Sequence, residues 1–187
     1  MNIGIIMTII TLTGNIGSGK TTIGKMLSTE LQYSFFSMGE FVRKQAQEKN
    51  MSILHFNKLG ENNPAHDLEL DKYYLTINPD SVVDGRLAWY HISSSFKVFL
   101  KCAYSTAAQR IYTKRRVGDH YREDINHLMN DIQKREEEDQ ERLYAVYKVN
   151  FLEEDHYHLV IETSDKSPQD IAQSILTHYK RYLLLNP

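Results

Sequence analysis

Residues 14–22 read Gly14-Asn15-Ile16-Gly17-Ser18-Gly19-Lys20-Thr21-Thr22 and match the pattern G-x-x-x-x-G-K-[ST] at every specified position. The apolar run 9–12 comes before this stretch, and an amphipathic segment, residues 22–31, comes after it. A strand, a glycine-rich turn and a helix form the arrangement in which successive backbone N–H groups converge on a phosphate. The stretch therefore predicts a binding site for a nucleoside triphosphate.

Each part of this loop has a physical role in holding a triphosphate. The glycines allow backbone angles and a close approach that a Cβ atom would block. Lys20 can neutralise the β- and γ-phosphates, and the hydroxyl of Thr21 can bind Mg²⁺. The alternative is a Gly/Ser turn that contains a lysine by coincidence, and the flanking strand and helix argue against it. We therefore expect ATP and Mg²⁺ as cofactors.

Outward from the loop, short apolar runs alternate with segments of helical spacing. After the strand that leads into the loop, we expect strands at 33–36, 81–83, 96–100 and 158–161. Helices are expected at 19–31, 40–49, 65–75, 105–116 and 123–147, and after Ser167, with Ser105 and Ser167 as N-caps of their helices. This alternation predicts an α/β fold in which helices cover both faces of a parallel sheet.

Composition narrows the class of protein. The chain has 187 residues, a formal net charge of -2 and one cysteine, Cys102, which exclude a broadly basic nucleic-acid binder and an intramolecular disulfide. Residues 1–12 are apolar but lack basic residues and a cleavage site, and they are too few to span a bilayer. We expect a single-domain, monomeric, cytoplasmic protein with no nucleic-acid or membrane partner.

Two regions are candidates for substrate binding. The helical stretch 39–75 is too long for a simple crossover between two strands, so it is a candidate substrate-binding insertion. The charged run 115–142 is a candidate mobile lid.

Asp84, Gly85 and Arg86 stand where a predicted parallel strand ends, and that edge of an open α/β sheet holds the ligand. An acid at this edge can orient the Mg²⁺ shell or the acceptor, and an arginine can clamp a phosphate with two hydrogen bonds. A simple turn is the alternative, since Asp-Gly is common in turns.

Arg135, Asp139 and Arg142 share one face of a predicted helix. Two arginines that flank an acid could grip an anionic sugar-phosphate. Charge runs are also typical of solvated helix surface, and the spacing alone leaves both interpretations open.

Taken together, these motifs resemble those of the cytidylate kinases, most closely the short archaeal-type branch of the nucleoside-monophosphate kinases. The resemblance runs from Thr8 to about Tyr179. The motifs that carry it are residues 14–22, Phe36-Ser37-Met38-Gly39-Glu40-Phe41-Val42-Arg43, Phe56-Asn57-Lys58-Leu59, Glu69-Leu70-Asp71, Asp84-Gly85-Arg86-Leu87-Ala88 and residues 135–142.

The resemblance implies a five-stranded parallel sheet with a helical monophosphate-binding insertion at about 37–75 and a lid at about 110–142. It also implies transfer of the γ-phosphoryl group of ATP to CMP or dCMP. On the acceptor side it places Ser37, Arg43, Asp71, Arg86, Arg135, Asp139 and Arg142, with the arginines on the phosphate and Asp139 on the sugar. Around the transferring phosphoryl group it places Lys20, Asp84 and a lid pair, Arg110 and Arg115.

Some residues depart from the family pattern. Asn15-Ile16 stands where this branch usually has two prolines, and Lys72-Tyr73 replaces a pair of arginines after Leu70-Asp71. Cytosine presents an amino donor beside a ring-nitrogen acceptor, so a CMP site needs an acceptor near the amino group and a donor beside it. We expect Asp67, Glu69 and Asp71, with Lys72, to read the base, although acids are also typical of a helix N-terminus.

Three other functions stay open from the sequence. A deoxynucleoside kinase would share the Gly-Asn-Ile-Gly loop, but the chain contains no Glu-Arg-Ser motif, and an unphosphorylated acceptor would not need these arginines. Another small-molecule or adenylate-type kinase is the second. A regulatory switch that binds a nucleoside triphosphate without transferring phosphate is the third.

Overall fold

Five parallel strands form one sheet in the order β2-β3-β1-β4-β5, as expected from the sequence. The computed structural model describes residues 8–52, 55–56, 59, 64–114 and 124–186. The strands are β1 (Ile9–Gly14), β2 (Ser34–Ser37), β3 (Ser81–Asp84), β4 (Phe96–Lys101) and β5 (Leu159–Glu162).

The helices lie close to their predicted positions, with two corrections. They are α1 (Lys20–Leu31), α2 (Met38–Glu48), α4 (Pro64–Asp71), the 3₁₀ helix η1 (Lys72–Thr76), α5 (Ala88–His91), α6 (Tyr104–Lys114), α7 (Ile125–Tyr147), the 3₁₀ turn η2 (Glu154–His156) and α8 (Pro168–Leu185). None of these helices is long and apolar enough to cross a bilayer.

The corrections concern the helices predicted at 65–75 and 105–116. The first is divided, because α4 ends at Asp71 and the tighter η1 follows, in which Tyr74 is buried against the sheet. The second does not begin with Ser105 as its cap. The carbonyl of Ala103 already accepts the first helical hydrogen bond from Ala107, so Ser105 lies exposed in the first turn.

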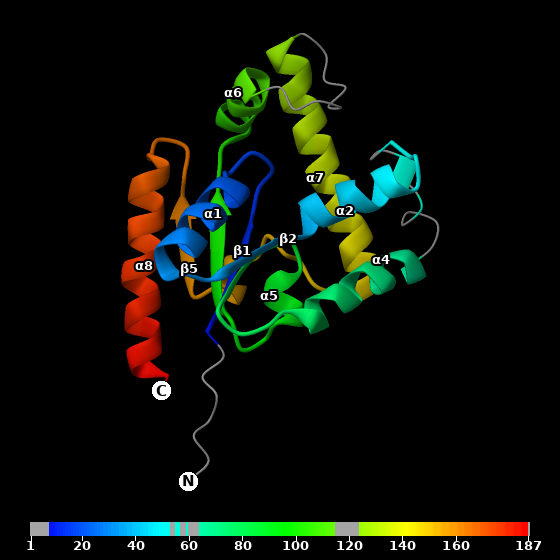
Figure 1. Ribbon diagram of the computed structural model, residues 1–187. Coiled ribbons are helices and arrows are strands. Elements are labelled where there is room, and N and C mark those ends of the chain that lie inside the picture. Colours follow the sequence, from blue (N-terminus) through cyan, green and yellow to red (C-terminus); the bar gives the residue numbers. More distant parts are fainter. Residues whose placement is uncertain (1–7, 53–54, 57–58, 60–63, 115–123, 187) are drawn as a thin grey trace.

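Helices α1 and α8 cover one face of the sheet and contact each other (Figure 1). The core on this side contains Ile10 and Leu12 from β1, together with Ile23 and Leu27 from α1 and residues of α8 that include Ile175. Because side chains alternate along a strand, Ile9 points to the opposite face, where it packs with Tyr74, Val83, Ala88 and Ile92. The prediction of a sheet covered on both faces is confirmed.

Helix α7 is one continuous helix of 23 residues that passes from α6 towards α4 and α5 (Figure 1). Near its start, Leu128 and Ile132 are buried against α6. Near its end, Leu143 is buried with Leu87 and Phe151. From Ile125 onward, the charged run is therefore a packed helix and not only solvated surface.

The start of α8 has the capping arrangement expected from the sequence. The hydroxyl of Ser167 accepts a hydrogen bond from the backbone N–H of Asp170 at 3.1 Å, and Pro168 occupies the first turn. This cap satisfies one of the N–H groups that the first turn of a helix leaves without a partner.

Replacing Ser167 with alanine is expected to lower the free energy of unfolding by about 1 kcal/mol, because the cap is lost. Urea unfolding followed by circular dichroism measures the change. Ser93→Ala, at an exposed turn before β4, is the control and should stay within about 0.5 kcal/mol of the wild type. Equal stability of the two variants would contradict the capping role.

Candidate active site

The carboxyl ends of β1, β2 and β3 meet at one edge of the sheet. The loop at 14–22 follows β1, while Ser37 ends β2 directly beside Asp84, which ends β3. Ligands of open α/β sheets bind at this edge, and the fold brings the glycine-rich loop, Ser37 and Asp84 together there.

The glycine-rich loop fits tightly between β4 and α6. At Gly14, whose φ is 147°, a Cβ atom would collide with the carbonyl of Leu100. At Gly17, whose φ is 76°, a Cβ atom would lie 2.7 Å from the Cβ of Ala107. Helix α1 then begins at Lys20, so its first N–H groups and those of the loop form an anion-binding end.

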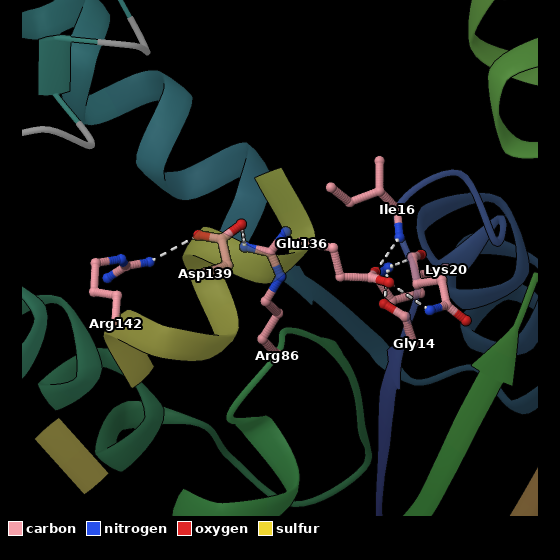
Figure 2. Close-up of polar contacts among 8 residues, drawn as sticks. Gly14, Ile16, Lys20, Arg86, Glu136, Asp139 and Arg142 are labelled. Carbon is pink, nitrogen blue, oxygen red and sulfur yellow. Dashed lines mark hydrogen bonds and ion pairs between the residues drawn. The ribbon is translucent and has the colours of Figure 1, made fainter. Parts of the chain in front are cut away.

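The ammonium group of Lys20 is held beneath the loop. Its Nζ donates to the carbonyl oxygens of Gly14 at 2.7 Å and Asn15 at 2.8 Å (Figure 2). Burial lowers the pKa of Lys20 to about 8, although Asp84 and Glu136 oppose the change. A bound anion would favour the protonated form, because it adds negative charge near the ammonium group.

Asp84 is buried and joins three segments through one carboxylate oxygen. Its Oδ2 accepts hydrogen bonds from the hydroxyl of Thr21 at 2.8 Å and from the hydroxyl of Ser37 at 3.1 Å. Ser37 also caps α2, since its hydroxyl accepts from the N–H of Glu40. The Asp84 carboxylate and the Thr21 hydroxyl thus lie side by side next to the loop.

A second cluster of charges lies beside this group. Figure 2 shows Asp139 of α7 between Arg86 and Arg142: one carboxylate oxygen forms an ion pair with Arg86, and the other accepts from Arg142 at 3.1 Å. The guanidinium of Arg86 also lies over the ring of Phe151, with 5.8 Å from Cζ to the ring centroid. The spacing alone left open whether the helix face with Asp139 and Arg142 is solvated surface or part of a site. In the structure this face of α7 is directed at the end of β3.

Burial and charge act in opposite directions on the pKa values in this cluster. Burial alone would raise the pKa of Asp139, but Arg86, Arg142 and Arg135 together hold that pKa below its usual value. Burial lowers the pKa of Arg86, and the attraction of Asp139 opposes the change. Arg135 is exposed, yet its charge acts on both groups.

Other predicted site residues lie in different surroundings. Arg43 follows the first turn of α2, and its guanidinium lies beside Gly39: a Cβ atom there would be 3.5 Å from Arg43 Nη1. Arg110 donates to the carbonyl oxygens of Gly17 at 3.3 Å and Thr163 at 2.5 Å, so it braces the glycine-rich loop against the end of β5. Arg115 lies outside the described residues.

Asp71 links three elements. Its carboxylate accepts a hydrogen bond from the hydroxyl of Tyr147 at the end of α7, and its Oδ2 lies 3.3 Å from Nε2 of His91 in α5. Glu69 and Lys72 are exposed. The side chain of Asp67 lies outside the part of the chain that the structure describes, so the expected base-reading group stays a prediction.

Sequence reasoning missed the buried Glu136, although a signal was present. This acid lies four residues after Ile132 and seven before Leu143, on the face that the helix buries. It contacts the glycine-rich loop and Tyr104, which the sequence did not single out either. An acid in an otherwise apolar series is the pattern that could have identified it.

Comparisons with known proteins agree with this geometry. The sequence model of the cytidylate kinase-like family matches residues 9–165. A cytidylate kinase from Methanobrevibacter smithii is 31% identical over 175 residues, which are 92% of this chain and 98% of that protein. Shikimate kinase from Acinetobacter baumannii, in complex with shikimate, has a TM-score of 0.61 at 20% identity, covering 96% of this chain and 94% of that chain, which shows a shared fold.

A third relative is much longer than this chain. An S-adenosylmethionine-dependent nucleotide dehydratase from Lacinutrix mariniflava is 34% identical over 176 residues. These residues are 92% of this chain but only 36% of the dehydratase. The chain therefore spans little more than a third of that relative and nearly all of the archaeal kinase.

Asp139→Asn is expected to lower the free energy of unfolding at neutral pH by about 2 kcal/mol, less than for a fully buried pair because Arg86 keeps some contact with water. The pKa of Asp139 is lowered in the folded protein, so its contribution is present above the unfolded pKa of about 4 and is lost as pH falls through the folded value. The deficit should therefore shrink in acid. Urea unfolding at several pH values measures it.

Asp131→Asn provides the matched control, because Asp131 is an exposed acid of the same helix. That variant should match the wild type at every pH. A deficit of Asp139→Asn that stays constant from neutral pH into acid would show that the carboxylate charge does not stabilise the arginines.

Proposed function

The chain belongs to the cytidylate kinase-like family, and from this premise we propose that it transfers the γ-phosphoryl group of ATP to CMP or dCMP, giving ADP and CDP or dCDP. The observation that carries the proposal is the pairing of two cationic sites at one sheet edge. Lys20 lies beneath the glycine-rich loop. Arg86 follows the end of β3, and both Arg86 and Arg142 pair with Asp139 of α7. One site suits a triphosphate, and the other suits a monophosphate.

On the donor side, the backbone N–H groups of residues 14–22 and the ammonium of Lys20 hold the ATP phosphates. Thr21 and Asp84 would hold Mg²⁺, because their oxygen atoms lie 2.8 Å apart and Mg²⁺ prefers a few protein oxygens beside substrate phosphates. When bound, the ion supplies positive charge to the oxygens of the transferring group.

On the acceptor side, Asp139 holds two guanidinium groups in place before the substrate arrives. Each guanidinium can offer a phosphate two parallel hydrogen bonds, and a pre-positioned fork loses less entropy on binding. Arg43 and Arg135 add positive charge at the same edge, and Asp139 can reach the sugar. In this assignment residues 37–75 form the monophosphate-binding insertion, and residues 110–142 form a lid that includes Arg115.

No covalent intermediate is needed for this reaction. An oxygen of the acceptor phosphate attacks the γ-phosphorus in line, and the bond to the β-phosphate oxygen breaks to release ADP. Lys20 and the arginines stabilise the charge that spreads over the transferring group. Catalysis is then mostly alignment of two anions that would otherwise repel each other.

A panel of acceptors tests the proposal. ADP formation is measured with ATP and each of CMP, dCMP, UMP, AMP and cytidine. The expected result is formation with CMP or dCMP well above that with cytidine, since the arginines recognise a phosphate. Equal rates with cytidine would favour a nucleoside kinase, and ATP binding without acceptor-dependent ADP formation would favour a regulatory switch.

Arg142→Ala is expected to lower kcat/KM for CMP at least about tenfold, since a hydrogen-bonded charge pair is worth roughly 1.5–3 kcal/mol. Arg142→Lys should restore only part of the loss, because a point charge cannot reproduce the fork. Steady-state kinetics measures both, with the affinity for ATP nearly unchanged. Arg181→Ala, at an exposed position of α8, is the control. Full activity of Arg142→Ala would overturn the role of this residue.

ATP binding should take up protons in mild alkali. Free Lys20 loses its proton with a pKa of about 8, and bound phosphate favours the charged form, so affinity should fall as pH rises through 8. At pH of about 8.5, calorimetry in buffers of different ionisation enthalpy should show uptake of roughly half a proton or more. Lys20→Ala should lose this uptake and Lys25→Ala should keep it. Equal uptake in both variants would contradict the assignment.

A further inference from the structure

Glu136 is a buried acid at the centre of α7. Its exposed fraction is 1%, and its neighbours on the same helix face are the buried Leu128, Ile132 and Leu143. An isolated carboxylate at such a place is unfavourable unless hydrogen-bond donors surround it. Its partners therefore show what the acid does.

Three donors converge on this carboxylate. Oε1 accepts from the backbone N–H of Ile16 at 3.1 Å, and Oε2 accepts from Nδ2 of Asn15 at 2.7 Å and from the hydroxyl of Tyr104 at 2.9 Å. Two of these donors belong to the glycine-rich loop and one to α6. Glu136 is thus a direct link between α7 and the loop.

The link continues to the sheet through Asn15. The side-chain oxygen of Asn15 accepts from the backbone N–H of Cys102, just after β4, at 3.1 Å. The first half of the loop is therefore held on two sides, by β4 and by α7. Figure 2 shows Glu136 beside Ile16 and Lys20, while Asp139, one turn further along α7, faces Arg86.

We propose that Glu136 is a positioning residue that sets the distance between the triphosphate loop and the acceptor arginines. The proposal rests on the proposed function, because it concerns the alignment of ATP with a monophosphate. Phosphoryl transfer needs the attacking oxygen close to the phosphorus, and a displacement of about 1 Å can cost on the order of a hundredfold in rate. A link from Ile16 to α7 fixes that distance without touching either substrate.

A purely electrostatic role makes the opposite prediction. The negative charge of Glu136 acts on both Lys20 and Arg86, between the two phosphate sites. If it only repelled nucleotides, its removal would tighten the binding of ATP. If it positions the loop, its removal lowers kcat and leaves the affinities nearly unchanged.

Three variants separate these roles. Glu136→Gln keeps the shape but offers one acceptor oxygen to three donors. Glu136→Asp keeps the charge but shortens the link by one methylene. Asn15→Ala leaves the carboxylate in place and removes its bridge to Cys102. The control is Glu137→Gln, at an exposed position next to Glu136 on the same helix.

Steady-state kinetics with ATP and CMP is combined with calorimetric binding of ATP and with thermal melting. We expect Glu136→Gln and Glu136→Asp each to lower kcat at least about tenfold, with both KM values within about threefold of the wild type. The double variant Glu136→Gln/Asn15→Ala should be hardly slower than the slower single variant, since both changes break one link. If the Glu136 variants do not fold, the kcat of Asn15→Ala tests the positioning role instead.

Each other outcome overturns the proposal. Normal kcat in well-folded Glu136→Gln removes the positioning role, and tighter ATP binding in that variant establishes repulsion instead. Normal kcat in Glu136→Asp alone assigns the effect to charge and not to distance. A wild-type protein without acceptor-dependent ADP formation removes the proposed function and this proposal together, whereas an active wild type with unimpaired variants removes this proposal alone.

Discussion

The buried carboxylate of Asp84 is the interaction on which the site depends. The carboxyl ends of parallel strands all lie at one edge of the sheet. At this edge, one oxygen of Asp84 at the end of β3 accepts hydrogen bonds from Thr21 in the first turn of α1 and from Ser37 at the end of β2. Because Thr21 lies in the first turn of α1 and Ser37 caps α2, this contact also fixes where both helices begin. The donor loop and the start of the acceptor region therefore share one anchor.

Helix α7 completes the site from the other side. Its apolar positions pack against α6 and against Phe151, while its polar positions contact the loop and the end of β3. One helix thus brings Glu136 to the triphosphate loop and Asp139 to Arg86. Most charged residues in a charge-rich helix are solvated. In α7, Glu136 and Asp139 are not.

The sequence predicted the parallel sheet, the glycine-rich loop and the helix cap at Ser167, because each is specified by neighbouring residues. The cap predicted at Ser105 was wrong, because the helix already begins before that residue. The sequence placed Arg86 and Asp139 at the site, although their ion pair joins residues far apart in the chain. The roles of Glu136 and Asp71 depend on partners more than seventy residues away, which local spacing does not encode. Lys20 was assigned from its motif, whereas its lowered pKa follows only from burial in the folded chain.

The central place of Glu136 in α7 also has a mechanical meaning. Glu136 lies eleven positions after Ile125 and eleven before Tyr147, so each half of the helix is about 16 Å long. A helix of this length is stiff, so a tilt of α7 about Glu136 would move its two ends in opposite directions. Because Tyr147 donates to Asp71, which directly precedes η1, such a tilt would connect the packing of α6 with the position of η1.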